Sequence, residues 1–263
     1  MKRLIINADD FGFTRDVNAG IVHAHQHGVL TSTTLMANGE AFDDAVRLAR
    51  ETPSLDLGCH LVLVEGVSIL TSRPFPERPN DLLIGLAKKQ LDLYAELRAQ
   101  VEKILAAGLK PTHLDSHKHT HIIPAVFRQT VRLAQEFGIP YVRLPLDETV
   151  PLARLPCALA SRYYRALARN YAVNMTDHFL GFRLTGSFNE ESFAALLSRL
   201  PQGTTEFMCH PGFVGPELQR ATTRLKESRM RELEALTSPR IRELMNAESI
   251  HLEGFCRRSS DFP

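Results

Sequence analysis

Short apolar runs alternate with longer amphipathic segments along this chain, and this alternation restricts the folds that are open to it. Residues 4–7 and 32–37 have the length and composition of strands, whereas residues 16–27 and 124–137 have helical spacing and each precede a glycine. Strands separated by helices indicate βαβ units and a parallel sheet. The other strand-like runs are residues 55–64, 112–116, 141–144, 179–184, 206–209 and 249–255, and the other helical runs are residues 40–51, 90–107 and 190–200.

The length of the chain suits a closed arrangement of these units. A TIM-type barrel takes roughly 250 residues, so the 263 residues predict an α/β fold, a distorted (β/α) barrel of seven to eight parallel strands. An open doubly wound sheet is the alternative, but no GxGxxG motif follows the first strand. We expect a single domain over residues 1–263, with insertions near residues 66–90 and 149–176. The first insertion is rich in proline and is typical of a loop that covers a site.

Composition excludes several functional classes. Lys and Arg number 31, Asp and Glu number 30, and tryptophan is absent, so we expect no nucleic-acid partner. No apolar run reaches the roughly 18 residues of a membrane-spanning helix. The run Leu4–Ile6 is too short for the core of a signal peptide, and the four cysteines lack paired spacing. These features predict a cytoplasmic protein with reduced thiols.

A histidine cluster is the strongest chemical signal. Four of the eleven histidines, with an aspartate among them, occupy alternate positions of a nine-residue stretch, namely His113, Asp115, His117, His119 and His121. In an extended strand all five side chains would share one face. His117 and His121 also have the i, i+4 spacing of one helical face. Because clustered imidazoles repel one another when charged, either geometry favours a bound metal or anion over a purely structural role.

Three further signals fall at the ends of predicted strands. Asp9 and Asp10 follow the first strand, and Gly12 permits a turn that could bring both carboxylates to the strand end. His60 interrupts an apolar strand, and His210 ends a late one. Taken singly, each is more often a turn residue or a core histidine, but the carboxyl ends of barrel strands meet at one rim. One Asp and two His around a divalent ion leave positions for water and substrate, which predicts metal-assisted hydrolysis.

The motifs that carry these residues resemble a known family. Together they are similar to the YdjC-like carbohydrate deacetylases, which include chitooligosaccharide deacetylases and deacetylases associated with hopanoid biosynthesis; the hopanoid branch is the more similar. The resemblance implies a barrel-like fold and metal-dependent removal of N-acetyl groups from amino sugars. The matching motifs are NADDFG at 7–12, TSTTLMANG at 31–39, GCHLVL at 58–63, KPTHLDSHKHTH at 110–121 and MCHPGF at 208–213.

The resemblance also implies a ligand set. Its metal triad falls on Asp10, His60 and His117, and His121 could replace or join His117. We expect one divalent ion. Zinc (Zn2+), cobalt (Co2+) or nickel (Ni2+) suits two imidazoles and a carboxylate, and magnesium (Mg2+) suits the site if water completes the shell.

Catalytic roles follow by the same resemblance. Asp9 matches the general base, His210 the acid that protonates the leaving amine, and Arg143 an arginine that orients the base. The remaining residues of the cluster are expected to support the ligands or to contact the sugar, namely His113, Asp115, His119 and His121.

The second insertion bears on the substrate. Residues 149–176 contain Arg154, Arg162, Arg165 and Arg169 among leucines and tyrosines, and no Asp or Glu. Such a segment could lie on an anionic membrane surface or form an ordinary interface helix. We therefore expect an N-acetylated amino-sugar substrate, either a chitooligosaccharide or an N-acetylglucosaminyl lipid. In the lipid case the protein would work at the inner face of the membrane, and a homodimer is also open.

Three other interpretations compete. An amidohydrolase-type barrel would bind two metals, and a non-catalytic sugar- or metal-binding barrel would hold an ion without turnover. A glycosidase needs two carboxylates about 5–10 Å apart across the bond, which sequence neighbours suit poorly. Two segments are predicted to be exposed: the histidines at 23, 25 and 27, and residues 220–242 as a salt-bridged helix face.

Overall fold

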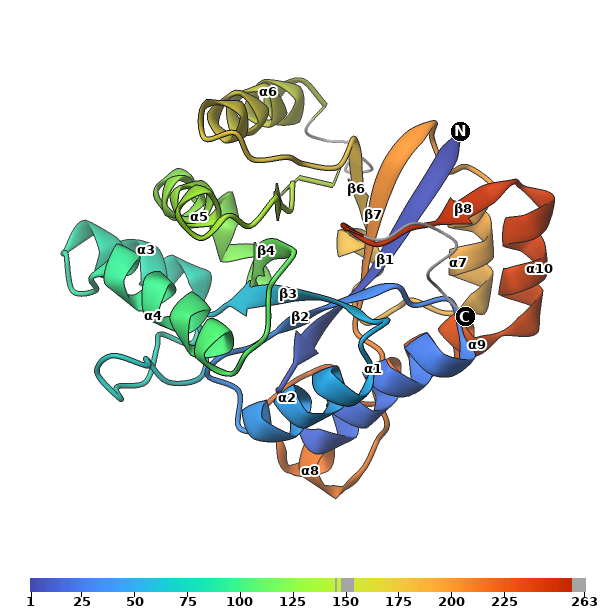
Figure 1. The fold of residues 1–263 in the computed structure, drawn as a ribbon, viewed down its shortest axis with the longest axis horizontal. Coiled ribbons are helices and arrows are strands. Elements are labelled where there is room, and N and C mark those ends of the chain that lie inside the picture. The colour runs from blue at the N-terminus through green and yellow to red at the C-terminus, as the bar shows by residue number, and fades with distance from the viewer. Residues whose placement is uncertain (145, 148–153, 257–263) are drawn as a thin grey trace.

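The protein is built around a curled parallel sheet. A computed structural model describes residues 1–144, 146–147 and 154–256, without the side chains of residues 154–158 (Figure 1). The strand order is β5-β4-β3-β2-β1-β7-β6, with β8 paired to β1, and the strand pairings are parallel. The strands are β1 (Lys2–Phe11), β2 (Ser32–Leu35), β3 (Asp56–Leu61), β4 (His113–Ser116), β5 (Tyr141–Val142), β6 (His178–Leu180), β7 (Gly203–Cys209) and β8 (Ile250–Leu252). The predicted distorted (β/α) barrel is confirmed.

β1 is the central strand of the sheet. Its first residues pair with β8, its length from Lys2 to Ala8 pairs with β7, and its last residues pair with β2. At the far edges, a parallel bridge joins Tyr141 of β5 to Asn174, just before β6. The sheet therefore curls towards closure, with the carboxyl ends of its strands on one rim.

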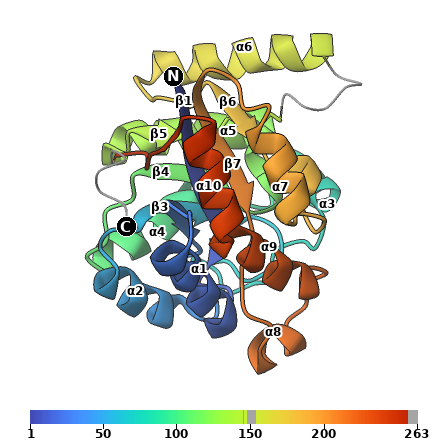
Figure 2. The ribbon, with the colours of Figure 1, turned by 90° about the vertical axis from the view of Figure 1, so that its right-hand side faces the viewer.

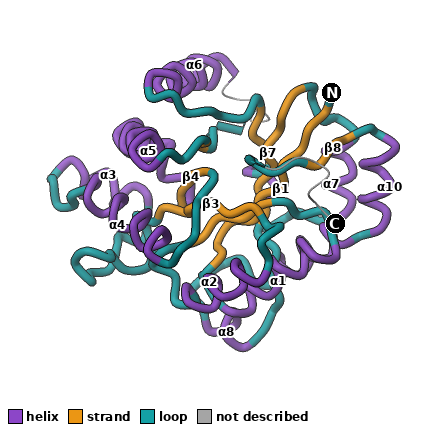
Figure 3. Tube along the Cα trace, viewed as in Figure 1, coloured by secondary structure: helices purple, strands orange, loops and turns teal. Residues whose placement is uncertain are grey.

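Helices surround the sheet (Figures 1 and 3). α5 shows how the sequence sets their limits: it begins at Pro124, where a missing N–H costs little, and ends at Phe137, directly before Gly138 with φ +65°. The longer helices are α1 (Arg15–His27), α2 (Phe42–Glu51), α3 (Pro79–Ala87), α4 (Leu93–Ala106), α5 (Pro124–Phe137), α6 (Arg154–Asn170), α7 (Glu190–Leu197), α9 (Glu227–Thr237) and α10 (Pro239–Ala247). The short ones are η1 (His117–Ile122), η3 (Phe182–Leu184) and α8 (Pro216–Arg220).

β3 is shorter than the apolar run 55–64 predicts, because a side chain replaces the neighbouring strand. The Val62 N–H donates to Gln100 Oε1 and the Val62 carbonyl accepts from Gln100 Nε2, both at 2.8 Å. The buried backbone is thus satisfied without sheet pairing. Alternation of apolar residues cannot reveal such a substitution.

Both insertions contain regular structure. The first includes α3, which was not predicted, and a bridge between Val67 and Pro74. Buried Glu96 anchors this loop by accepting from Ser68 Oγ at 2.6 Å and from the Ile69 N–H at 3.0 Å. The second insertion contains α6, which packs against α5 at the edge of the molecule (Figure 2). Its residues 149–153 lie outside the described residues.

Two other findings concern the helices. The prediction that His25 is exposed is wrong: its ring is 1% exposed, with Nδ1 2.8 Å from the Leu30 carbonyl and Nε2 2.7 Å from Ser54 Oγ. Within the described part of the chain, no helix combines the length and apolar character needed to cross a lipid bilayer.

Candidate functional site

The two aspartates at the end of β1 both face the interior because the strand is irregular there. Asp10 has φ +69°, and the pairing of β1 with β2 shifts register between Ala8 and Phe11. The expected turn therefore involves Asp10 itself, and Gly12 follows it with φ +95°. In a regular strand, neighbouring side chains would point to opposite faces. Here Asp9 and Asp10 are each only 3% exposed.

Asp10 meets two histidines from neighbouring parts of the sheet. Its Oδ1 lies 3.0 Å from Nδ1 of His117 and 3.5 Å from Nε2 of His60. Donor atoms of the three residues lie within 4.8 Å of one another, close enough to share one cation. One carboxylate and two imidazoles form a donor set that suits a divalent transition metal. The structure thus brings together the three residues that the family resemblance implied.

Asp115 supports this group from behind. Its Oδ1 lies 2.7 Å from Nδ1 of His60, which leaves Nε2 of that ring directed at Asp10. Burial lowers the pKa of His60, but the negative charges of Asp115 and Asp9 outweigh it and raise the pKa to about 10. A carboxylate behind a ligating imidazole fixes its orientation and increases its basicity.

His117 leaves the strand instead of continuing it. β4 ends at Ser116, and Lys118 and His119 have left-handed φ values of 51° and 52° inside η1. The extended strand that would have put every clustered histidine on one face therefore does not form. The ring of His117 sits between Asp10 and Glu65, whose Oε2 lies 3.4 Å from Nε2.

The remaining histidines of the cluster lie apart from this group. His113 is fully buried, which shields it from a sugar, and its Nε2 lies 3.0 Å from Asn7 Oδ1. His121 is also fully buried and lies 2.6 Å from Ser116 Oγ. Among the described residues it belongs to neither group that could hold an ion. His119 is buried as well, with Nε2 3.1 Å from the sulfur of Met208.

Arg143 binds three carboxylates at once. Its guanidinium contacts Asp9 at 2.7 and 2.8 Å, Asp115 at 2.7 Å and Glu206 at 2.6 Å, and it is fully buried. Burial raises the pKa of Asp9, but the charge of Arg143 outweighs it and holds the pKa well below its ordinary value. Asp9, His60 and Asp115 form a second possible cation group. Arg143 already neutralises the two carboxylates of this second group.

Four supporting residues were missed by the sequence reasoning: Glu65, Glu206, and Arg229 and Glu232 of α9. The prediction that residues 220–242 form an exposed face is wrong for the last two, since each is 1% exposed. Arg229 Nη2 lies 2.5 Å from Asp10 Oδ2. A signal was present, because positions 229, 232, 233 and 236 recur at helical spacing and the last two are leucines.

His210 follows β7 at the same rim. It is 8% exposed, and its Nδ1 is buried without a hydrogen-bond partner among the described residues. Burial lowers its pKa to about 4. Its backbone N–H donates to Glu232 Oε2 at 2.5 Å.

A cleft of about 990 Å³ reaches the His117 side of the candidate metal group. Its walls come from the loops after β1 and β2, the anchored first insertion and the segment around α8, and they include Phe13, Met36, Phe75, Glu65, Glu77 and His117. This volume suits a small-molecule ligand. The mixture of rings and carboxylates suits a polar ligand with apolar faces, as a sugar has.

Comparison with known proteins agrees with these features. A carbohydrate deacetylase of Brevibacillus brevis is 34% identical over 262 residues, which cover 96% of this chain and 98% of that protein. A chitooligosaccharide deacetylase of Salmonella paratyphi B is 34% identical over 251 residues, 89% of this chain and 90% of that one. A solved structure from Enterococcus faecalis V583, described as a candidate cellobiose-phosphate cleavage protein, superposes with TM-score 0.81 at 28% identity and covers 97% of both chains. The profile of the YdjC-like proteins matches residues 3–247, and the chain belongs to that family.

Proposed function

We propose that this chain is a metal-dependent carbohydrate N-deacetylase, a hydrolase that removes the acetyl group from an N-acetylglucosamine-containing substrate. The observation that carries the proposal is the meeting of Asp10, His60 and His117 beside a separately held carboxylate, Asp9. The names of the relatives from Brevibacillus and Salmonella support the acetylated-sugar class.

Asp10, His60 and His117 would hold the ion. A divalent cation bound there would polarise the acetyl carbonyl and lower the pKa of a bound water. Two nitrogen donors favour zinc, cobalt or nickel, whereas magnesium prefers oxygen. Arg229 holds the second oxygen of Asp10, which leaves Oδ1 for the cation.

Asp9 is the proposed general base. Its Oδ1 accepts from Arg143 and from Asn7 Nδ2, whereas Oδ2 accepts from Arg143 alone among the described residues and retains a lone pair. That lone pair would take a proton from the attacking water. Arg143 fixes the carboxylate plane, so the direction of the free lone pair is set before substrate arrives.

His210 is the proposed general acid. An amide nitrogen leaves poorly unless it is protonated, so the reaction requires a proton donor as well as a base. His210 follows β7, the strand next to β1 in the sheet, and it lies within the electrostatic reach of Asp10 and Asp9. Its proton would go to the departing nitrogen as the C–N bond breaks.

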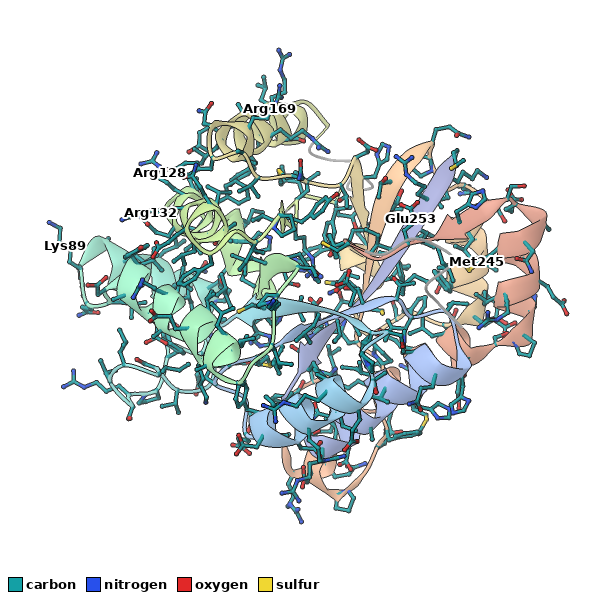
Figure 4. The ribbon with its side chains drawn as sticks, in the orientation of Figure 1. Lys89, Arg128, Arg132, Arg169, Met245 and Glu253 are labelled. Carbon is teal, nitrogen blue, oxygen red and sulfur yellow. The ribbon has the colours of Figure 1, made fainter. Side chains whose placement is uncertain are left out.

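The substrate is either a free chitooligosaccharide or a lipid-linked sugar, and α6 bears on the choice. Leu159 and Tyr163 are 61% and 42% exposed, and Arg169 points away from the rest of the molecule (Figure 4). Arg165 instead donates to the Thr176 carbonyl. Exposed apolar groups beside arginines suit an anionic membrane surface. If the substrate is a lipid, Arg169→Gln should weaken binding to anionic phospholipid vesicles, and unchanged binding would remove the membrane part of the proposal.

The competing functions make different predictions. A non-catalytic barrel would bind metal tightly without releasing acetate from any acetamide. An amidohydrolase-type enzyme would bind two metals, and Arg143 argues against that because it occupies Asp9 and Asp115 of the second group. A glycosidase would use two carboxylates that face each other across a bond, whereas Asp9 and Asp10 are each engaged by a separate arginine.

The decisive experiment is acetate release from diacetylchitobiose and from an N-acetylglucosaminyl lipid, each with and without a chelator. Chelator-sensitive release is expected from at least one of them, and the preferred substrate identifies the class. Metal binding without release from either would contradict the proposal and favour the binding barrel or an amidohydrolase acting on another amide.

A further inference from the structure

Asn7 and Asp9 lie two positions apart on β1, so their side chains share one face of the strand. Asn7 is fully buried, and its Nδ2 lies 3.0 Å from Oδ1 of Asp9. An ionised carboxylate offers only acceptors. The group of Asn7 that faces Asp9 is therefore the NH₂ group, and the amide oxygen of Asn7 faces the other way.

His113 meets that amide oxygen from another part of the sheet. β4, which carries His113, lies three strands from β1, yet Nε2 of the ring is 3.0 Å from Oδ1 of Asn7. Because an amide oxygen can only accept, Nε2 has to carry a proton. Burial and the charge of Arg143 hold the pKa of His113 well below its ordinary value, so the ring is neutral and Nδ1 is an acceptor.

Thr112 supplies the donor that this acceptor requires. Its Oγ1 lies 3.0 Å from Nδ1 of His113. The Leu57 carbonyl, 3.2 Å from the same hydroxyl, already accepts the Thr112 N–H at 2.8 Å, so the hydroxyl proton is available to the imidazole. The donors then run in one direction along a chain of hydrogen bonds, from Thr112 to His113, to Asn7 and to Asp9.

Two neighbours hold the ring of His113 in place. Phe255 stacks on it, with ring centroids 3.7 Å apart and an interplanar angle of 19°. Gly58 leaves room for the ring, since a Cβ at that position would lie 2.5 Å from Cε1 of His113. Packing therefore fixes the ring as well as the hydrogen bonds at its two nitrogens.

We propose that His113 is a positioning residue for the general base: its Nε2–H fixes the amide of Asn7, and Asn7 thereby leaves Oδ2 of Asp9 as the oxygen that takes the proton. This inference rests on the proposed deacetylase function. Oδ1 of Asp9 accepts from Arg143 at 2.7 Å and from Asn7 at 3.0 Å, which occupies both of its lone pairs. Oδ2 accepts from Arg143 at 2.8 Å and, among the described residues, keeps one lone pair for water.

The proton balance involves Asp9 alone. As the attacking water loses its proton to Oδ2, the electron pair of the broken O–H bond stays on the water oxygen and forms the bond to the acetyl carbon. His113 and Asn7 exchange no proton in this step. Without the His113 donor the amide of Asn7 can turn over, which frees a lone pair on Oδ1 and gives the base a second direction that does not point at the attacking water.

Filling the interior of the barrel is the alternative role of His113, and two substitutions separate the roles. Leucine in His113→Leu occupies similar space but donates no hydrogen bond. Glutamine in His113→Gln places an amide nitrogen where Nε2 lies, so it can still donate to Asn7. A packing role predicts similar behaviour of the two variants, whereas the positioning role predicts that glutamine rescues what leucine loses.

The test measures acetate release by the full chain from diacetylchitobiose, or from an N-acetylglucosaminyl lipid if the wild type prefers it. We expect His113→Leu to lower kcat by about tenfold or more, with KM and metal content close to wild type, because a misdirected base slows the reaction and leaves binding intact. His113→Gln should recover most of that loss. His25→Leu is the matched control, since His25 is also buried with both ring nitrogens hydrogen-bonded but lies on α1, and its kcat should equal that of wild type.

Wild-type turnover in His113→Leu, or an equal loss in the leucine and glutamine variants, would overturn the inference. ¹⁵N NMR of the wild-type histidines tests it independently of activity, with His113 assigned by the signal that His113→Gln lacks. The ring should carry its proton on Nε2 and a lone pair on Nδ1 at neutral pH, and the opposite tautomer would also overturn the inference. This measurement decides if the leucine variant fails to fold. Failure of the wild-type protein to release acetate would instead count against the deacetylase function itself.

Discussion

Replacing Arg143 with methionine should expose how much of the fold depends on one buried charge. Arg143 is fully buried and neutralises Asp9, Asp115 and Glu206 through contacts of 2.6–2.8 Å. Methionine fills part of the space but supplies no donor. The variant therefore leaves three carboxyl groups in a dry site without their shared cation.

The expected loss is about 3–5 kcal/mol of unfolding free energy at neutral pH, the usual cost of removing one partner from a buried ion pair. Asp9 makes this loss depend on pH. In the native protein its pKa lies below the ordinary 3.8, so its contribution to stability is present above that value and is lost as the pH falls. In the variant, burial is opposed only by His60 and His210, so we expect the pKa of Asp9 to rise above 3.8. The variant should then lose stability as the pH rises, so the gap to wild type widens from acidic to neutral pH.

Urea unfolding at about pH 5 and pH 7, with chelator present so that no cation replaces the arginine, measures this gap. Arg47→Met is the matched control, because Arg47 pairs with Asp44 and Glu51 on an exposed helix face and its loss should change little. A pH-independent loss would mean that the cost is cavity formation alone. A loss no larger than that of the control would refute the reasoning that Arg143 neutralises the site.

Three further predictions concern the site. Asp9→Asn should abolish acetate release yet leave metal bound, whereas His60→Ala should lose both; metal analysis beside the activity assay checks this, and wild-type activity in Asp9→Asn would reject the base assignment. Asp115→Asn should weaken metal affinity by about 10–100-fold through His60, measured by competition with a chelator, and an unchanged affinity would contradict the supporting role. Gly20→Ala would put its Cβ 2.4 Å from Cα of Gly212, in the loop that follows His210. The substitution should therefore lower the free energy of unfolding by about 1–3 kcal/mol and reduce turnover more than metal binding. Wild-type stability on thermal unfolding would show that this packing is looser than the structure indicates.

The sequence predicted the fold because its signals are local. Apolar runs, helix stops such as Gly138 and the βαβ order depend on neighbouring residues and on chain length. The errors of the prediction arise from tertiary contacts. The end of β3 is set by a side chain of α4, Gln100, and α3 is an apolar helix with no polar face to give it amphipathic periodicity. Neither can be read from local spacing.

The same distinction between local and tertiary signals applies to the residues of the candidate site. Asp10, His60 and His117 could be found because each stands at a strand end within a recognisable motif. Arg229 and Glu232 could not be assigned, because mixed charges on a helix are usually solvated. Only the packing of α9 against the rim shows that they face Asp10 and His210. A charged residue in register with buried leucines is the sequence feature that separates such a helix from an exposed one.

Asp9 and Asp10 show how sequence neighbours acquire different proposed roles. Burial raises the pKa of both, yet both remain ionised because each has its own arginine: Arg143 follows β5 and Arg229 comes from α9. The left-handed φ of Asp10 separates their directions, so Oδ1 of Asp10 meets the histidines while Asp9 is held by Arg143 in the plane of its guanidinium. The backbone and the two arginines, rather than the identical side chains, therefore determine which aspartate can bind a cation and which can accept a proton.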